Sequence, residues 1–348
     1  MQIIKESIFI SAIRSFFSTL LGTLGIFIAI IPIFIFISII SSDKMDTMKT
    51  KMEIVPDHLG NSKILPISAP VILNIDIQGV IGMENGIKAE DIQMQLLDSR
   101  KGFLKNNRVK AILLNMNTPG GSVIDSDIID RKLLEYKKTY NVPIYTYVDG
   151  MCASGGMWVA SSCDVILSSY TSIIGSVGVF NGPFFNFYDA MEKYGIKSKT
   201  IFEGKDKIAL SPFKKWQDDE GDFYKNITLF YYNMFVDIVS KARNIDKTKL
   251  VNEYGAHVFD PVTAEKIGYI DKANLGYNEA IIELSKKASI DIEKPYQIVS
   301  LTIKKKWPLN FKSKLSSFLK SLIIETISSE SNPKENQINS LPQARLDG

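Results

Sequence analysis

Ser154 stands among small residues where one sequence pattern gives way to another. Residues 142–148 are β-branched and aromatic, which is typical of a buried strand, and the apolar run from Met157 is typical of a helix. The chain is therefore expected to turn sharply at Ser154. The first amides of a helix have no partner within it, and neighbouring glycines leave room for a substrate backbone. Ser154 is thus a candidate nucleophile beside oxyanion donors, or only a helix cap.

Gly120 and Gly121 form a second turn of the same kind. A strand-like run over 109–116 precedes them, and a helical pattern over 125–140 follows Ser122, a candidate N-cap. Two successive strand, turn and helix units favour an α/β fold with a parallel sheet and right-handed crossovers. Both turns are then expected at the same sheet edge, where one supplies a nucleophile and the other a backbone N–H.

The base that would activate Ser154 has several candidates. One of the two histidines, His257, leaves a Ser-His-Asp triad open, since triad members occur in any chain order. A lysine also serves as base when burial lowers its pKa. Lys205 and Lys207 share a glycine-bounded loop, and Lys207 precedes an apolar Ile-Ala-Leu run. Lys207 is the more easily desolvated of the two and is the favoured base.

Four segments of the chain resemble the signal peptide peptidase A and SohB-like serine peptidases of family S49. They are Asn117 to Val123, Met151 to Gly156, Thr171 to Val179 and Gly204 to Pro212, in the order and spacing of that family. The resemblance covers roughly residues 71–276. Two departures occur. Met116-Asn117-Thr118 stands where a pair ending in Asn-Ser is usual, which keeps the shape of the turn. Phe259-Asp260-Pro261 replaces a glycine-containing turn far from the proposed chemistry.

The resemblance implies that Ser154 is the nucleophile, that Lys207 is the general base and that Ser176 hydrogen-bonds and orients the lysine. The implied oxyanion hole uses backbone N–H groups at Gly120, Gly121 and Gly155. The implied fold is the α/β ClpP/crotonase type, a repeated ββα spiral. Extended polypeptides such as signal peptides are the implied substrates. The resemblance also implies a homo-oligomer with sites between protomers, in which Lys207 reaches a neighbour's Ser154.

A second interpretation keeps the fold without the peptidase activity, as an inactive S49 or crotonase-like scaffold or an acyl-binding protein. Such a protein would hold a thioester oxygen with the same N–H pair, and it would need a carboxylate acid or base in the cleft. Asp149 and Asp164 flank the turn and are the candidates. An Asp beside a turn more often caps it.

Composition narrows the class of protein. The 348 residues are 45% hydrophobic, enough for one large catalytic domain, and the net charge of +3 does not indicate nucleic acid. No phosphate-binding glycine loop occurs, and neither a cofactor nor a metal is expected. Cys152 and Cys163 are expected to be buried thiols without a disulfide, and Cys152 is not expected to act as a nucleophile. Residues 217–243 carry apolar side chains at helical intervals, which indicates a core or a subunit contact: Phe223, Ile227, Phe230, Met234 and Ile238.

The N-terminal region predicts a membrane anchor. No charged residue occurs over 15–42, a stretch long enough to cross about 30 Å of hydrocarbon and longer than the apolar core of a signal peptide. Basic residues on both sides leave its orientation open. The resemblance implies a bacterial inner membrane with an extracytoplasmic catalytic domain. We expect a flank at 1–14, a transmembrane helix at 15–42, a polar stalk at 43–66, the peptidase domain at 67–300, a basic amphipathic segment at 301–327 and a disordered tail at 328–348. The amphipathic segment fits either a lipid surface or the main domain.

Overall fold

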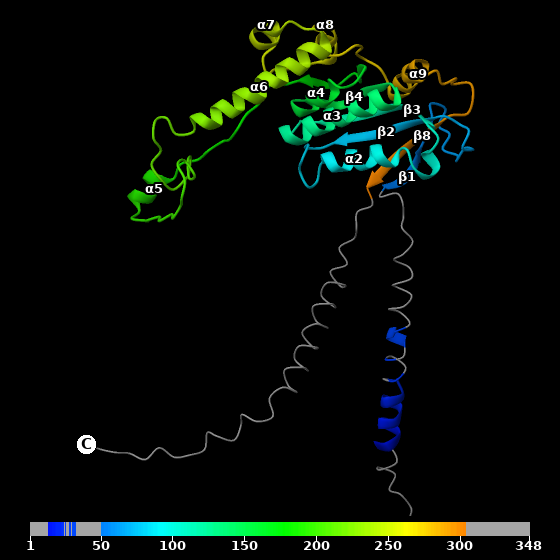
Figure 1. Cartoon of the computed structure of the whole chain (residues 1–348), viewed down its shortest axis with the longest axis horizontal. Helices are drawn as coiled ribbons and strands as arrows, with labels where there is room; N and C mark the ends of the chain where they lie inside the picture. The colour runs from blue at the N-terminus through cyan, green and yellow to red at the C-terminus, as the bar shows by residue number, and fades with distance from the viewer. Residues whose placement is uncertain (1–12, 24, 26–27, 29, 33–49, 304–348) are drawn as a thin grey trace, which may run out of the picture. The chain divides into compact units, whose positions relative to one another are not determined.

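The computed structural model describes residues 13–23, 25, 28, 30–32 and 50–303. Residues 50–303 form an α/β domain around one mixed eight-stranded sheet (Figure 1). Its strands are β1 (Thr50–Val55), β2 (Val71–Gln78), β3 (Val109–Thr118), β4 (Ile144–Ala153), β5 (Val165–Ser168), β6 (Ile173–Gly175), β7 (Val258–Phe259) and β8 (Gln297–Ile303). Its helices are α2 (Ala89–Asp98), α3 (Val123–Tyr140), α4 (Gly155–Ala160), α5 (Tyr188–Lys193), α6 (Asp222–Arg243), α7 (Lys247–Lys249), α8 (Pro261–Lys266) and α9 (Tyr277–Lys287). A 3₁₀ turn at Gly102–Leu104 and a π turn at Leu250–Tyr254 complete the list.

The strands follow the order β1-β8-β2-β3-β4-β6-β7, and β5 pairs with β4 outside that path. The pairs β2–β3 and β3–β4 are parallel, as the successive strand, turn and helix units predicted. Antiparallel pairs occur only at the two ends of this order, between β1 and β8 and between β6 and β7. Parallel strands need cover on both faces, which explains why almost all of β2 is buried.

Helices cover the two faces of the sheet in separate layers. On one face, alternate strand residues such as Leu73 and Ile75 pack in one core with Ile129 of α3 and Trp158 of α4. On the other face, the intervening residues form a second core with α9 around Ile281. Figure 1 shows α3 and α4 together, with α9 apart from them. The site therefore rests on a sheet that is packed from both sides.

The first glycine turn has the cap that its sequence predicts. Ser122 precedes α3, and its Oγ accepts a hydrogen bond from the Asp125 amide at 3.2 Å. The helix ends at Asn141, whose φ of 51° is left-handed and stops further helical hydrogen bonding.

Strand β4 is longer than its apolar pattern predicts. The expected strand ended at residue 148, but β4 continues to Ala153 because Met151, Cys152 and Ala153 pair with β6. The first half of β4 pairs with β5 instead, from Tyr145 to Val148. The sharp turn lies at Ser154, as the sequence predicts.

The prediction of a polar stalk at 43–66 is wrong for residues 50–55, which form a strand. Residues 50–55 are β1, which pairs along its whole length with β8. Pairing with β1 also carries β8 to Ile303, past the expected domain end at residue 300.

Other expected segments fall wholly or partly outside the described residues: 1–14, 15–42, 43–49, 304–327 and 328–348. Of the described residues up to 32, each is helical. None of the helices in the described part of the chain combines the length and the apolar character needed to span a bilayer.

Candidate active site

Ser154 is the single residue between β4 and α4, and its backbone is strained. Its φ of 51° and ψ of −120° lie where residues with a side chain are rare. Its amide donates to the Gly175 carbonyl at 2.9 Å, which fixes the turn to the end of β6. The Ser154 hydroxyl makes no capping hydrogen bond. Ser154 thus occupies the N-cap position of α4 without capping the helix through its side chain, and this half-buried hydroxyl has no hydrogen-bond partner among the described residues.

Ser176 lies beside Ser154 because their strands are paired in parallel. Ala153 of β4 is in register with Gly175 of β6, and each of these residues is followed directly by a serine. Ser154 and Ser176 therefore lie at the ends of neighbouring strands. Paired strands lie about 4.8 Å apart. Ser176 also has a left-handed φ of 55°, and its amide donates to the His257 carbonyl at 2.7 Å. Two strained serines thus border one site.

The Gly120-Gly121 turn lies directly against the Ser154 turn. A Cβ added at Gly120 would lie 2.6 Å from the Gly155 nitrogen and 2.8 Å from the Ser154 Cβ. Glycine is required there by this close approach as well as by its φ of +95°. Among the described residues, neither the Gly121 amide nor the Gly155 amide donates a hydrogen bond to protein. The predicted oxyanion residues are thus brought together beside the Ser154 hydroxyl.

A cleft of about 1320 Å³ contains the predicted site residues Ser154, Ser176, Gly120, Gly121 and Gly155. Part of its wall is apolar, where the indole of Trp158 stacks on Phe235 with ring centroids 5.1 Å apart. The wall contributed by α6 was not predicted as part of the site. Its cleft residues lie at helical intervals along one face: Asp222, Tyr224, Lys225, Thr228, Leu229, Tyr232 and Phe235. The sequence contains this spacing, but other aromatic residues of the same helix do not line the cleft, so the spacing alone does not distinguish the cleft face.

Lys207 is not brought to Ser154 within one chain. Its side chain is exposed and does not line the cleft, although Leu210, three residues later, does. Lys205 is exposed as well. The imidazole of His257 is exposed and also outside the cleft lining, so this histidine meets the site only through its backbone carbonyl.

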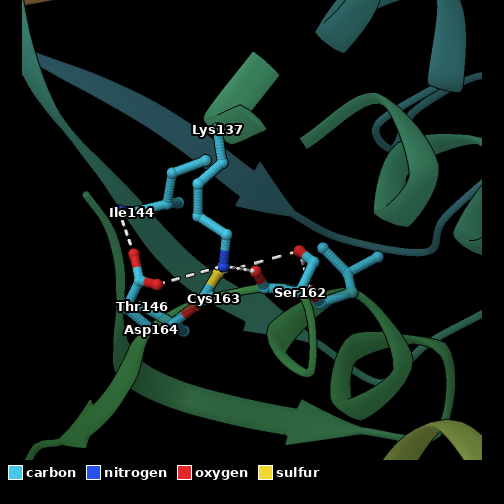
Figure 2. Close-up of polar contacts among 7 residues, drawn as sticks. Lys137, Ile144, Thr146, Ser162, Cys163 and Asp164 are labelled. Atoms are coloured by element: carbon cyan, nitrogen blue, oxygen red, sulfur yellow. Dashed lines mark hydrogen bonds and ion pairs between the residues drawn. The ribbon is translucent and has the colours of Figure 1, made fainter. Parts of the chain in front are cut away.

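The two carboxylates that the sequence offers for a crotonase-like acyl-binding site, Asp149 and Asp164, do not line the cleft. Asp164 accepts hydrogen bonds from the Ile144 amide at 2.8 Å and from Lys137 Nζ at 3.1 Å (Figure 2). It therefore ties the start of β4 to α3. Asp149 is exposed and does not line the cleft either.

The cysteines are free thiols, as expected. Burial raises the pKa of Cys152 well above its usual range, so this thiol stays protonated. Burial likewise raises the pKa of Cys163 to about 12. The sulfur of Cys163 accepts a hydrogen bond from the Thr146 hydroxyl at 3.1 Å (Figure 2). In the part of the chain that the structure describes, no group of three or more His, Cys, Asp or Glu side chains is placed to hold a metal ion.

Comparison with known proteins identifies the family. A family model described as Peptidase family S49 matches residues 136–291. A putative signal peptide peptidase SppA of Enterococcus faecium is 29% identical over 220 residues, which are 62% of this chain and 63% of that protein. A putative protease of Methanocaldococcus jannaschii is 30% identical over 271 residues, which are 76% of this chain and 83% of that protein. This chain belongs to peptidase family S49.

The S49 match includes Ser154, Ser176 and Lys207, and it begins after the Gly120-Gly121 turn. In the folded chain this turn lies directly against Ser154 and Gly155. Among solved structures, a ClpP1 mutant from Listeria monocytogenes has a TM-score of 0.38 and 15% sequence identity with this S49 chain. The alignment covers 61% of this chain and 95% of the ClpP1 chain.

Proposed function

We propose that the protein is a membrane-anchored serine endopeptidase with a Ser154/Lys207 dyad. The observation that carries this proposal is the free hydroxyl of Ser154, beside two glycine amides that donate to no protein acceptor in the described chain. A nucleophile and preorganised donors at one point are what acyl transfer requires.

In the proposed reaction, uncharged Lys207 takes the proton of Ser154 as Oγ attacks the carbonyl carbon of the scissile peptide bond. The tetrahedral oxyanion is held by the amides of Gly155 and of the Gly120-Gly121 turn. The C–N bond then breaks, and the leaving amine takes the proton from Lys207. Lys207 then takes a proton from water as the water oxygen attacks the carbonyl carbon of the Ser154 ester. The ester C–O bond breaks, Ser154 Oγ takes the proton back from Lys207, and the second product leaves as the acid. Ser176 would accept or donate a hydrogen bond at the lysine nitrogen and orient it.

The position of Lys207 supports a site shared between protomers. The residue lies outside the cleft of its own chain, within a region from 180 to 230 that exposes many large apolar side chains. Examples are Phe180, Phe185, Phe187, Ile201, Phe213 and Phe230. Exposed apolar clusters of this kind mark protein contacts. We therefore infer a homo-oligomer in which Lys207 of one protomer serves Ser154 of the next.

The remaining parts of the proposal concern substrate and location. A long cleft with glycine backbone on one side and aromatic side chains on the other suits an extended, apolar polypeptide, and signal peptides are such substrates. The uncharged residues 15–42 support anchorage in a lipid bilayer, and we place the enzyme at the bacterial inner membrane with an extracytoplasmic catalytic domain. The forked pairing of β4 supports a ββα spiral of the ClpP/crotonase type.

Fluorophosphonate labelling of the full chain in detergent tests the chemistry. We expect labelling of Ser154 in the natural chain and almost none in Lys207→Met, because the proposed base is then missing. His257→Ala, which removes an imidazole outside the cleft lining, should label like the natural chain. Equal labelling of Lys207→Met and the natural chain would refute the dyad.

Mixing two inactive variants tests the shared site. Ser154→Ala and Lys207→Ala should each lack peptidase activity, and co-expression should restore part of it by pairing an intact lysine with an intact serine. Mixed oligomers that form but stay inactive would show that both residues must come from one chain.

A further inference from the structure

Glu220 is a buried carboxylate that joins three parts of the loop carrying Lys207. It lies just before α6, and its side chain is only 6% exposed. Its Oε1 accepts a hydrogen bond from the Leu210 amide at 2.6 Å. Its Oε2 accepts from Lys214 Nζ at 2.6 Å and from the Gln217 amide at 3.1 Å. One side chain thus holds the loop at three positions.

The loop between Lys207 and this carboxylate is a chain of tight turns. The Ala209 amide donates to the Asp206 carbonyl at 3.0 Å, and the Ser211 amide donates to the Ile208 carbonyl at 3.1 Å. Lys207 lies within the first turn, and Leu210 lies within the second. A displacement of Leu210 is therefore transmitted to Lys207 over three residues.

Leu210 needs such a restraint because its backbone is strained. Its φ of 57° is left-handed, a conformation that a branched side chain adopts at a cost of about 1–3 kcal/mol. The short hydrogen bond to Glu220 holds the amide of this residue, and the Leu210 side chain packs against Gly221, where an added Cβ would lie 3.0 Å away. Without Glu220 the turn is expected to relax.

The carboxylate is suited to this task because it stays ionised. Burial acts to raise the pKa of Glu220, but hydrogen bonds from Lys214 and from the Gln217 and Leu210 amides outweigh it and hold the pKa below its usual range. Glu220 also lines the same cleft as Ser154, so the loop is held at the cleft wall itself.

We propose that Glu220 is a positioning residue that fixes the Lys207 loop at the cleft wall, so that the amine is presented to Ser154 of the neighbouring protomer. This inference rests on the proposed function, because it assumes that Lys207 is the base. The carboxylate touches no reacting atom and acts only through the turn at Leu210.

Three variants test the inference in the full chain, with a fluorogenic apolar peptide as substrate and fluorophosphonate titration to count active sites. Glu220→Ala should lower kcat per active site about 10- to 100-fold, because a displacement near 1 Å is enough for such a loss. KM should change less than about twofold, since substrate contacts remain. Glu220→Gln keeps one acceptor oxygen and should lose less activity. Asp219→Ala removes the adjacent exposed carboxylate and should match the natural chain.

Hydrogen exchange gives the local readout. The Leu210 and Gln217 amides should lose protection in Glu220→Ala and should lose only part of it in Glu220→Gln. If Glu220→Ala does not fold, the test rests on Glu220→Gln alone. The inference then requires a fall in kcat together with faster hydrogen exchange at these two amides.

The outcomes separate this inference from the proposed function. If Lys207→Met abolishes activity while Glu220→Ala and Glu220→Gln keep the natural kcat, the positioning role is refuted and the dyad stands. A rise in KM without a fall in kcat would also refute it, because the carboxylate would then serve substrate binding. If Lys207→Met keeps full activity, the dyad fails and the positioning role fails with it.

Discussion

The strained backbone of Ser154 predicts an unusual order of stability between the glycine and alanine variants of this residue. Its φ of 51° and ψ of −120° suit glycine, while any residue with a Cβ carries strain of about 1–3 kcal/mol. Ser154→Gly removes that strain but gives the unfolded chain extra entropy, which costs about 0.5–1 kcal/mol. Ser154→Ala keeps the strain. The glycine variant should therefore be the more stable by about 1 kcal/mol, the reverse of the usual order.

Denaturant titration of the full chain in detergent, at one protein concentration, measures this difference. A matched pair of substitutions at Ser161, the C-cap residue that directly follows α4, provides the control. Its φ of −64° and ψ of −18° are ordinary helical values, and both substitutions remove the same hydroxyl. Ser161→Ala should be more stable than Ser161→Gly by about 0.5–1 kcal/mol. If alanine is also the better residue at position 154, the backbone is not strained there and our account of the Ser154 turn is wrong.

Three further predictions concern the framework around the site. Gly120→Ala should destabilise the chain by at least about 1–3 kcal/mol and lower peptidase activity, because its Cβ would lie 2.6 Å from the Gly155 nitrogen. Gly60→Ala, with a similar φ and nothing within 4 Å, should cost less in the same unfolding assay. Burial, and then the charge of a neighbouring aspartate, raise the pKa of Asp130 to about 7 from 3.8, so the folded chain binds a proton that the unfolded chain releases. The stability that Asp130 contributes should be fully present below about pH 4 and should be lost as the pH rises through about 7. Asp130→Asn should therefore match the natural chain at about pH 4 and be more stable by up to about 4 kcal/mol at about pH 8 in denaturant titrations, and equal stabilities at pH 8 would refute this. Asp164→Asn should lower stability by about 1 kcal/mol and leave kcat per active site unchanged, because its carboxylate is bound to Lys137 Nζ at 3.1 Å outside the cleft; a large fall in kcat would count against a purely structural role.

The parts of the site that lie within short segments could be predicted from the sequence. A strand pattern, glycines and a helical pattern define the Ser154 turn and the Gly120-Gly121 turn without long-range information. That these turns meet at one sheet edge follows from the parallel pairing of successive strands. Both expectations agree with the register of β3 and β4.

Features that depend on distant partners could not be predicted in this way. Glu220 is one of several acidic residues in its segment, and only the folded loop shows that it alone is buried against Leu210 and Lys214. The apolar stripe of α6 was recognised, but spacing does not reveal what covers it. Phe223, Ile227 and Phe230 are exposed in the single chain.

Strand β1 was missed although its sequence carries a signal. In Thr-Lys-Met-Glu-Ile-Val the exposed Lys51 and Glu53 alternate with the half-buried Met52 and Ile54, which is the pattern of an edge strand. The segment was assigned as a stalk because of its polar composition and its position after the apolar N-terminal region. Its partner, β8, lies at the far end of the domain sequence, so no local pattern revealed the pairing.

The change of partner along β4 has a mechanical consequence. The half that pairs with β5 is embedded in the packed framework, while the last three residues pair only with β6 on that side. The amide of Ser154 is bonded to Gly175, so a sideways shift of β6 carries Ser154 and Ser176 together. The spacing of the two serine backbones is thereby set by strand pairing and not by the cleft wall that α6 contributes.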